Sequence, residues 1–332
     1  MEYEEWVCML TYDLKVGYSC NNKCKHCVID DSKDKLINLN KKIDLTTEEC
    51  ISKINNASSK GVNDIVLTGG EVTLRKDFSD LIKKCVECDL NITIQTNGRK
   101  LFEEKIIDVI KDIKKIKFII ALHGDTAEMH DSITQIKGSF EQTCKGIKAM
   151  CELGKLVVLK VVISKINASK LSEILKVASK LGVKYICFAF PHGQGAARKN
   201  FDDVMLTYSY LKPYLDQLIT SAKKMCINVE FEAVPFCIIP QAMQMVGELK
   251  YYYGKSICEP VKEFMFEWDE IRRSIKKKGK NCNKCDMNEF CEGVWCEYVD
   301  AFGTNELNPI VFSSEKKDML ITKIREYLYH HK

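Results

Sequence analysis

The sequence predicts an α/β protein, a partial (β/α)6 TIM-like barrel followed by a small cysteine-rich α+β extension. Two observations predict the barrel. Short β-branched runs alternate six times with longer helical patterns, and each run is nearly continuously apolar, as in parallel strands covered on both faces. A closed barrel needs eight such units, and six are recognisable, so an open barrel is expected. A cysteine-dense, turn-rich region at 282–296 predicts the extension.

The strands and helices of the barrel follow from this alternation. Strands are expected at 11–18, 64–68, 91–96, 117–122, 156–163 and 184–190, and helices at 46–60, 77–88, 102–115, 139–153 and 169–181. The run Thr-Thr-Glu-Glu from Thr46 is typical of a helix start. Gly154 and Gly182 stand where two helices should end.

The pattern changes after about residue 200, which divides the chain into two predicted domains. Residues 1–200 form the barrel, and residues 201–332 form a smaller unit packed on it. In the second unit a helix is expected at 203–225 and a strand at 227–232, while 251–262 is expected to be irregular.

Composition excludes several classes of protein. The 332 residues are 45% hydrophobic, enough for a large core, and the 50 basic and 46 acidic residues leave a net charge of +4. This balance makes nucleic acid an unlikely partner. No run of 18 apolar residues exists, and the acidic residues 1–6 do not resemble a signal peptide. The sequence therefore predicts a soluble, cytoplasmic protein without a membrane partner.

Cysteine is unusually frequent, with 17 residues. An odd number in a chain without an export signal argues against a disulfide framework and favours metal ligation by some of the thiols.

The first cysteine cluster directly follows the first strand. Cys20, Cys24 and Cys27 have the spacing C-x3-C-x2-C. Three thiolates on one loop can hold three irons of a cubane iron–sulfur cluster and leave the fourth iron open. The alternative is a zinc site with His26 as the fourth ligand.

With this motif the sequence resembles the radical S-adenosylmethionine (radical SAM) enzymes. Gly69, Gly70 and Glu71 close the second strand and resemble the Gly-Gly-Glu element of that superfamily. The glycines allow close backbone approach. The resemblance implies a partial (β/α)6 barrel, a [4Fe-4S] cluster on the three cysteines, and SAM bound to its open iron, with Glu71 helping to receive the methionine ammonium group.

Weaker matches lie at the ends of later strands. The resemblance implies that Asn97, His123, Ser164 and Asn167 line the SAM site. In the Ala-Leu-His-Gly run that contains His123, Ala121 replaces the serine common in maturases of the superfamily. Asn97 and His123 have an alternative role as residues that structure a loop or strand end.

The second cysteine cluster, Cys282, Cys285 and Cys291, resembles the SPASM and twitch extensions of radical SAM enzymes, which hold auxiliary clusters. The resemblance implies one auxiliary [4Fe-4S] cluster. Its fourth ligand is expected to be Cys237, which follows a Pro-Phe turn, with Cys258 and Cys296 as alternatives. Structural zinc is the other possibility for this site.

The resemblance implies an enzyme that cleaves SAM reductively to a 5′-deoxyadenosyl radical, which abstracts a hydrogen from substrate. The expected substrate is a peptide or protein side chain, giving a thioether, a carbon–carbon crosslink or an epimerised residue. A flavodoxin or ferredoxin is the expected electron donor, and no catalytic acid or base is assigned. Alternatives are cofactor biosynthesis similar to the molybdenum-cofactor cyclase and a non-catalytic metal-binding regulator.

Overall fold

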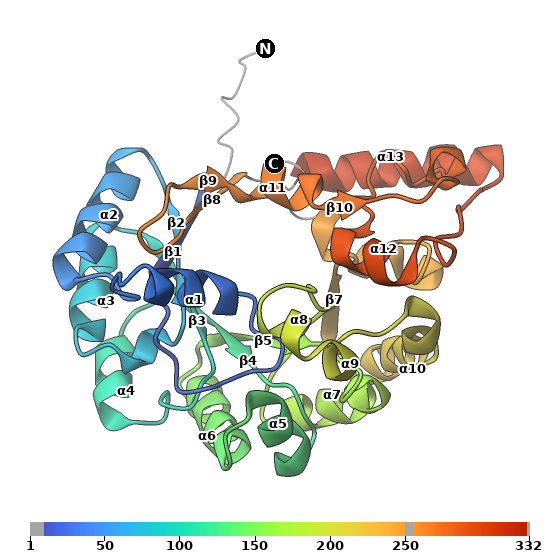
Figure 1. Cartoon of the computed structure of the whole chain (residues 1–332). Helices are drawn as coiled ribbons and strands as arrows, with labels where there is room; N and C mark the ends of the chain where they lie inside the picture. Colours follow the sequence, from blue (N-terminus) through green and yellow to red (C-terminus); the bar gives the residue numbers. More distant parts are fainter. Residues whose placement is uncertain (1–9, 250–251, 253–254, 331–332) are drawn as a thin grey trace.

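The computed structural model describes residues 10–249, 252 and 255–330. Cys8 and the acidic residues 1–6 lie outside the described residues. The predicted partial barrel is confirmed: six parallel strands pair in sequence order, with helices around the outside (Figure 1). They are β1 (Leu10–Gly17), β2 (Asp64–Gly69), β3 (Asn91–Thr96), β4 (Ile116–Ala121), β5 (Leu156–Val162) and β6 (Tyr185–Ala189).

The sheet continues beyond these six strands at both edges. At one edge β7 (Asn228–Glu232) pairs in parallel with β6, close to the expected strand. At the other, β8 (Lys255–Glu259) pairs in parallel with β1, and β9 (Phe266–Glu267) pairs antiparallel with β8. The expectation of irregular structure at 251–262 was therefore wrong for β8. The β8 sequence is short and polar, so it lacks the apolar pattern that predicts a strand. It forms a strand because its backbone pairs with the edge of β1.

The helices on the outside of the barrel agree with the expected positions to within two residues, except that the helix expected at 102–115 ends five residues early, at Ile110. Two more helices were not expected. The expected ones are α2 (Thr47–Ser59), α3 (Phe78–Glu87), α4 (Glu104–Ile110), α6 (Ser139–Glu152) and α7 (Leu171–Lys180). The additional helices are α1 (Asp30–Asn38) and α5 (Ala127–Thr134). Helix α1 was not predicted because Leu36 is its one buried residue, and a helix with a single buried side chain has almost no apolar periodicity in its sequence.

The α2 helix begins as the sequence predicts. Thr46 is its N-cap residue, its side chain accepts from the Glu49 backbone N–H, and the Glu49 side chain accepts in return from Thr46 N. Such a capping box satisfies two backbone donors that the first turn would otherwise leave free.

Residues 201–332 complete the sheet and build the extension. Between β6 and β7 lie α8 (Ala196–Lys199), α9 (Phe201–Val204) and α10 (Tyr208–Met225). The single helix expected at 203–225 is therefore interrupted between α9 and α10. The extension contains α11 (Trp268–Ser274), α12 (Cys296–Phe302), α13 (Ser314–His330) and a hairpin of β10 (Lys276–Lys277) and β11 (Val294–Trp295). Because β7 and β8 belong to the barrel sheet, the division after residue 200 stays a prediction.

The strands present two different faces. Leu14, Ile65 and Phe188 are fully buried beneath the helices. The opposite face lines the inside of the open barrel and carries polar groups. There Lys15 pairs with Asp13 at 2.9 Å, and Lys160 forms an ion pair with Glu232. A barrel interior with polar side chains is suited to receive a ligand rather than to pack as a core. None of the described helices is both long and apolar enough to cross a membrane.

A buried ion-pair network joins the extension to the barrel. The Nζ of Lys276 lies 2.7 Å from Glu248 Oε1 and 2.8 Å from Glu292 Oε2. Glu248 Oε1 also accepts from the Ala233 backbone N–H just after β7. Burying these charges is unfavourable, but removing one partner would leave the others buried and unpaired, which is also unfavourable. The network therefore holds the extension in one position on the barrel.

Candidate functional site

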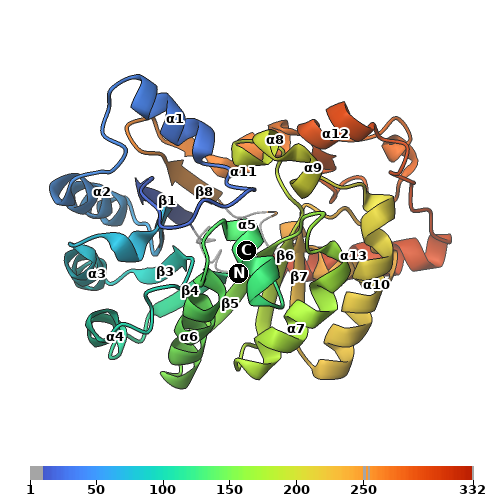
Figure 2. The same ribbon diagram turned by 60° about the horizontal axis from the view of Figure 1, so that its bottom comes forward.

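The loop from Cys20 to Cys27 lies at the carboxyl end of β1, the end where parallel barrels carry their functional residues. Its start is held by Asp44, whose Oδ1 accepts from Tyr18 N at 2.9 Å and from Ser19 N at 3.0 Å. Its far end is held by the loop after β6, where Ala196 N donates to Cys27 O at 2.9 Å. The loop therefore bridges the first and sixth strands of the barrel (Figure 2).

The three thiols of this loop influence one another. Burial raises the pKa of the Cys24 thiol, and the neighbouring Cys27 and Cys20 thiols raise it further. Burial likewise raises the pKa of Cys27 to about 11. Neutral thiols that must ionise to bind a metal release protons when they do so. Every cysteine in the described part of the chain is a free thiol.

The three thiols of this loop suit a soft metal or an iron–sulfur cluster. Among the described residues, the one group of three potential ligand atoms within 4.8 Å of one another lies elsewhere, at Cys187, Glu230 and Glu232. Cys20, Cys24 and Cys27 are free thiols on one loop, and they remain the proposed ligands of an iron–sulfur cluster.

Gly69 and Gly70 allow β2 to approach the start of the cysteine loop. A Cβ on Gly69, which has φ +128°, would lie 2.1 Å from Gly17 O, and one on Gly70 would lie 2.1 Å from Ser19 O. Instead, Gly70 N donates to Gly17 O at 2.7 Å and Glu71 N donates to Ser19 O at 2.8 Å. The two glycines therefore anchor the cysteine loop through its backbone.

Replacing Gly69 by Ala is expected to lower the free energy of unfolding by about 2–4 kcal/mol, because the new methyl group overlaps a backbone oxygen in addition to the strain of a positive φ. The matched control is Gly154→Ala, where φ is +68° and nothing lies within 4 Å of the new Cβ. We expect the control to lose about 1–2 kcal/mol, as measured by denaturant unfolding. Equal losses in the two variants would show that the contact with Gly17 is unimportant.

Glu71 is buried, and its carboxylate connects the ends of β2 and β3. Oε1 accepts from the Thr73 and Thr96 hydroxyls, both at 2.6 Å, and from Thr73 N at 3.1 Å, while Oε2 accepts from Asn97 N at 2.7 Å. The structure thus gives Glu71 a positioning role in the loop after β3. Its predicted contact with the ammonium group of SAM remains a prediction.

Asn97 lies against the cysteine loop. Its Nδ2 donates to Asn21 Oδ1 at 2.6 Å and lies 3.9 Å from Cys20 Sγ. Arg99, which sequence reasoning missed, holds the same loop: Nη1 donates to Asn21 O at 2.6 Å and to Asn22 Oδ1 at 2.9 Å. The signal that could have found Arg99 is a charged residue two positions after Asn97, at the functional end of a strand.

His123 belongs to a group of three buried histidines. Its ring packs edge-on against His26, with centroids 4.4 Å apart, and is stacked with His130 at 5.9 Å. Burial lowers the pKa of His26 and of His130 to about 4, and that of His123 well below its usual value. All three rings are therefore neutral at pH 7.

Ser164 and Asn167 lie at the end of β5 and differ in their hydrogen bonding. The Asn167 amide is fully engaged, since it accepts from Ser164 N at 2.8 Å and donates to His123 O and Val162 O. Ser164 Oγ is buried without a hydrogen-bond partner among the described residues, as are His26 Nδ1 and His130 Nε2. A polar ligand at this end of the barrel would satisfy such atoms, which fits the predicted SAM site. Contact between Asn167 and SAM stays a prediction.

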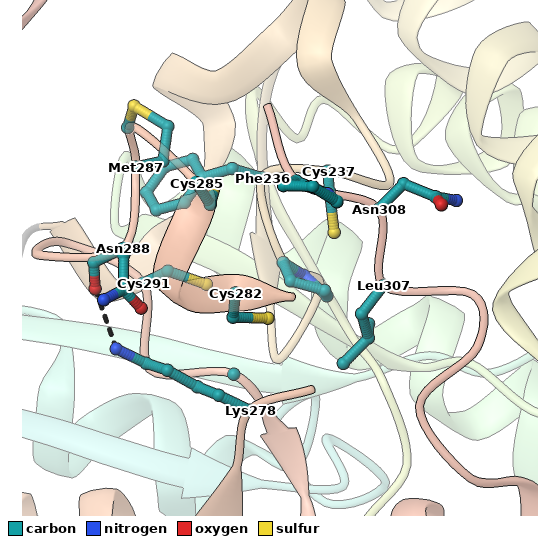
Figure 3. A pocket seen from close by; sticks show the side chains of 13 residues that line it. Phe236, Cys237, Lys278, Cys282, Cys285, Met287, Asn288, Cys291, Leu307 and Asn308 are labelled. Atoms are coloured by element: carbon teal, nitrogen blue, oxygen red, sulfur yellow. Dashed lines mark hydrogen bonds between the residues drawn. The ribbon is translucent and has the colours of Figure 1, made fainter. Parts of the chain in front are cut away.

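The second cysteine cluster converges on one pocket of the extension. Cys237, Cys282, Cys285 and Cys291 line it together (Figure 3). Burial, together with the neighbouring Cys291, Cys282 and Cys285 thiols, raises the pKa of Cys237 to about 12. Backbone groups point at two of the sulfurs: Gly279 N donates to Cys282 Sγ at 3.2 Å and Ile310 N to Cys285 Sγ at 3.3 Å. Donors of this kind stabilise ionised thiolates.

The other candidates for the fourth ligand lie elsewhere. Cys258 is buried inside the barrel on β8, where its nearest charged groups are Lys15 and Asp13. Cys296 begins α12 beside Glu297 and does not line the pocket. These positions favour Cys237 over both, and the four pocket cysteines remain the proposed ligand set.

Comparisons with known proteins agree with this geometry. The chain is 25% identical over 334 residues to the AdoMet-dependent heme synthase of Methanosarcina barkeri, covering 89% of this chain and 93% of that one. It is 24% identical to a probable GTP 3′,8-cyclase of Saccharolobus islandicus over 86% of this chain and 89% of that protein. It is 26% identical to the subtilosin biosynthesis protein AlbA of Bacillus subtilis, over 55% of this chain but only 40% of AlbA.

Solved structures of similar fold cover nearly the whole chain. The anSMEcpe structure with bound AdoMet and a peptide has a TM-score of 0.63 at 14% identity, covering 97% of this chain and 99% of that one. Streptococcus suis SuiB bound to the precursor peptide SuiA has a TM-score of 0.62 at 15% identity, covering 88% of this chain and 73% of that one. The fold is therefore that of radical SAM enzymes with a cysteine-rich extension.

The family model described as the Radical SAM superfamily matches residues 14–181, half of the chain, and includes the three-cysteine loop and the Gly-Gly-Glu element. Members of this family use a [4Fe-4S] cluster together with SAM. This chain belongs to the radical SAM superfamily and is a radical SAM enzyme.

Proposed function

We propose that this enzyme removes a hydrogen atom from a side chain of a peptide or protein and thereby prepares that residue for crosslinking or epimerisation. When bound, the cluster and SAM supply the radical chemistry of the family. Cys20, Cys24 and Cys27 would hold the cluster, and the neighbouring ends of β2 to β5 would receive SAM. A flavodoxin or ferredoxin is proposed as the electron donor.

The observation that carries the peptide proposal is the second site, lined by four cysteines, that accompanies the open barrel and its Cys20–Cys27 loop. A pocket lined by four cysteines would leave no iron of an auxiliary cluster free. Such a cluster suits electron transfer or support of the fold rather than substrate ligation. The near-complete fold likeness to anSMEcpe, whose structure includes a bound peptide, supports a peptide substrate for this architecture.

Two other substrate classes have specific support. The similarity to the heme synthase and to the probable GTP cyclase extends over almost the full length of both chains, whereas the similarity to AlbA covers less than half of AlbA. GTP, which the name of the cyclase gives, is therefore one competing substrate and corresponds to the cofactor-biosynthesis alternative. The other competing class is a porphyrin of heme synthesis, represented by the Fe-coproporphyrin III that gives its name to a synthase of Methanosarcina barkeri, which is 29% identical over 51% of this chain.

The test is anaerobic turnover of the reconstituted enzyme with SAM and dithionite. Three candidate substrates are compared: peptides selected from a random displayed library by binding to the enzyme, Fe-coproporphyrin III, and GTP. We expect only a selected peptide to stimulate 5′-deoxyadenosine formation, by about tenfold or more. We also expect deuterium from a deuterated peptide to appear in the 5′-deoxyadenosine.

The control is the same peptide with its amino-acid order scrambled, which should give only the slow background cleavage of SAM. Stimulation and deuterium transfer from the porphyrin or from GTP, with none from any selected peptide, would contradict the peptide proposal and assign the corresponding competing class.

A further inference from the structure

A second group of polar side chains lies where the loop after β6 meets the start of α12. His192 and Gln194 come from the loop, and Trp295 and Glu297 come from the extension. The rings of His192 and Trp295 pack with centroids 4.1 Å apart. Gln194 Nε2 donates to Glu297 Oε1 at 2.7 Å, and His192 Nδ1 lies 3.7 Å from the same oxygen. We call these four residues the β6–α12 cluster.

Three atoms of the β6–α12 cluster are buried without a hydrogen bond. Trp295 Nε1, Glu297 Oε2 and His192 Nδ1 have no partner within the described part of the chain. Trp295 is only 7% exposed. Leaving a buried donor or acceptor unsatisfied is unfavourable, and three such atoms in one place indicate that a polar ligand completes them.

The β6–α12 cluster lies next to the proposed SAM cluster loop. Gly195 follows Gln194, and a Cβ on Gly195 would lie 2.3 Å from Cys27 O. A Cβ on Gly193 would lie 2.7 Å from the Glu297 Cβ. Residues 193–195 are therefore in close contact both with the first cysteine loop and with the extension. The cluster is at the carboxyl end of β6, on the functional face of the barrel.

The chemistry of the unsatisfied atoms defines the ligand. The indole N–H of Trp295 can only donate, and a carboxylate oxygen of Glu297 can only accept. Burial lowers the pKa of His192, while the neighbouring Glu297 raises it. Lys276 lies over the Trp295 ring at 4.7 Å from its centroid and is itself paired with Glu248 and Glu292. The site thus offers one fixed donor and one charged acceptor to a ligand that has one of each.

We propose that the β6–α12 cluster binds a backbone amide of the peptide substrate. The amide carbonyl would accept from Trp295 Nε1, and the amide N–H would donate to Glu297 Oε2. His192 packs on the indole and positions it. This inference deepens the proposed function and rests on it, because it requires a peptide substrate. Holding the main chain of the peptide beside the Cys20–Cys27 loop would determine which side chain of the peptide reaches the 5′-deoxyadenosyl radical.

The experiment measures binding of one library-selected peptide to the reconstituted enzyme with SAM. Trp295→Phe retains the aromatic ring but removes the donor, and Glu297→Gln retains the shape but removes the charge. We expect the dissociation constant to rise about fivefold for Trp295→Phe and tenfold or more for Glu297→Gln. Trp268→Phe, a half-buried tryptophan at the start of α11, is the matched control and should change affinity less than twofold.

Methylation of the peptide backbone separates a direct contact from a structural effect. Each amide nitrogen of the selected peptide is methylated in turn. We expect one position to weaken binding to the unmodified enzyme but to have little further effect on Glu297→Gln, since both changes remove the same hydrogen bond. Thermal unfolding of each variant verifies that it folds. If Trp295→Phe is unstable, the Glu297→Gln comparison alone decides.

The outcomes distinguish this inference from the proposed function. Peptide binding that is unaffected by either variant, with no methylation position coupled to Glu297, would overturn the subsite while the peptide function stands. Binding and turnover of GTP or Fe-coproporphyrin III in place of any peptide would overturn both. Weaker binding of Trp295→Phe and Glu297→Gln together with one coupled position supports the inference.

Discussion

Replacing Cys24 by Ala is expected to reduce 5′-deoxyadenosine formation at least about 100-fold, because even residues that only support metal ligands cost up to that factor when changed. Cys24 is the most buried of the three thiols in the loop and has the other two as neighbours. Its loss would leave two thiolates for a cubane with three protein-bound irons. The iron content should therefore also fall by about four per chain. Anaerobic reconstitution followed by iron analysis and a SAM cleavage assay measures both quantities.

The matched control for Cys24 is Cys88→Ser, which changes a half-buried thiol at the C-terminal end of α3. Cys88 caps the C-terminal end of α3, on the exterior of the barrel, and belongs to neither cysteine cluster. We expect Cys88→Ser to retain iron and SAM cleavage. Full activity in Cys24→Ala would contradict the proposed ligand set.

The second large effect is expected from Cys237→Ser in the extension. Cys237 lines the same pocket as Cys282, Cys285 and Cys291. Removing its thiolate should cost the auxiliary cluster and about four irons per chain. SAM cleavage without substrate should persist, because the Cys20–Cys27 loop is held by the barrel. Iron analysis and electron paramagnetic resonance of the reduced protein can separate the two clusters.

Cys258→Ser and Cys296→Ser are the matched controls for Cys237, and both should retain about eight irons per chain. Loss of iron in Cys296→Ser but not in Cys237→Ser would move the fourth ligand to the start of α12. If the extension holds zinc instead, Cys237→Ser would leave the iron content unchanged and release about one zinc per chain. Each result identifies a different metal site.

Much of the barrel could be predicted because its signals are local. The run at Asn91–Thr96 is rich in β-branched residues and is followed by the turn residues Asn97 and Gly98, and the observed strand has the same bounds as the prediction. The capping box at Thr46 begins α2 where expected. Helix α1 escaped prediction because it buries one side chain and is held by ion pairs to distant residues, such as that between Asp30 and Lys199.

The β8 strand shows why other parts could not be predicted. Its sequence, Lys-Ser-Ile-Cys-Glu, has mixed polarity: it begins with an exposed lysine and ends with a buried glutamate. It becomes a strand because the free edge of β1 offers backbone hydrogen-bonding groups in register, with Asp13 opposite Cys258. That edge exists only after the barrel has formed, and no window of sequence around β8 contains it.

The sequence alone determined the family and the two sets of closely spaced cysteines, since residues within a few positions of one another are brought together by the chain itself. The tertiary structure decided which distant residues join them. It placed Cys237 beside Cys282, left Cys258 inside the barrel, and brought Trp295 against His192. Contacts between residues far apart along the chain depend on how whole strands and helices pack, and this packing is a property of the complete fold rather than of any local pattern.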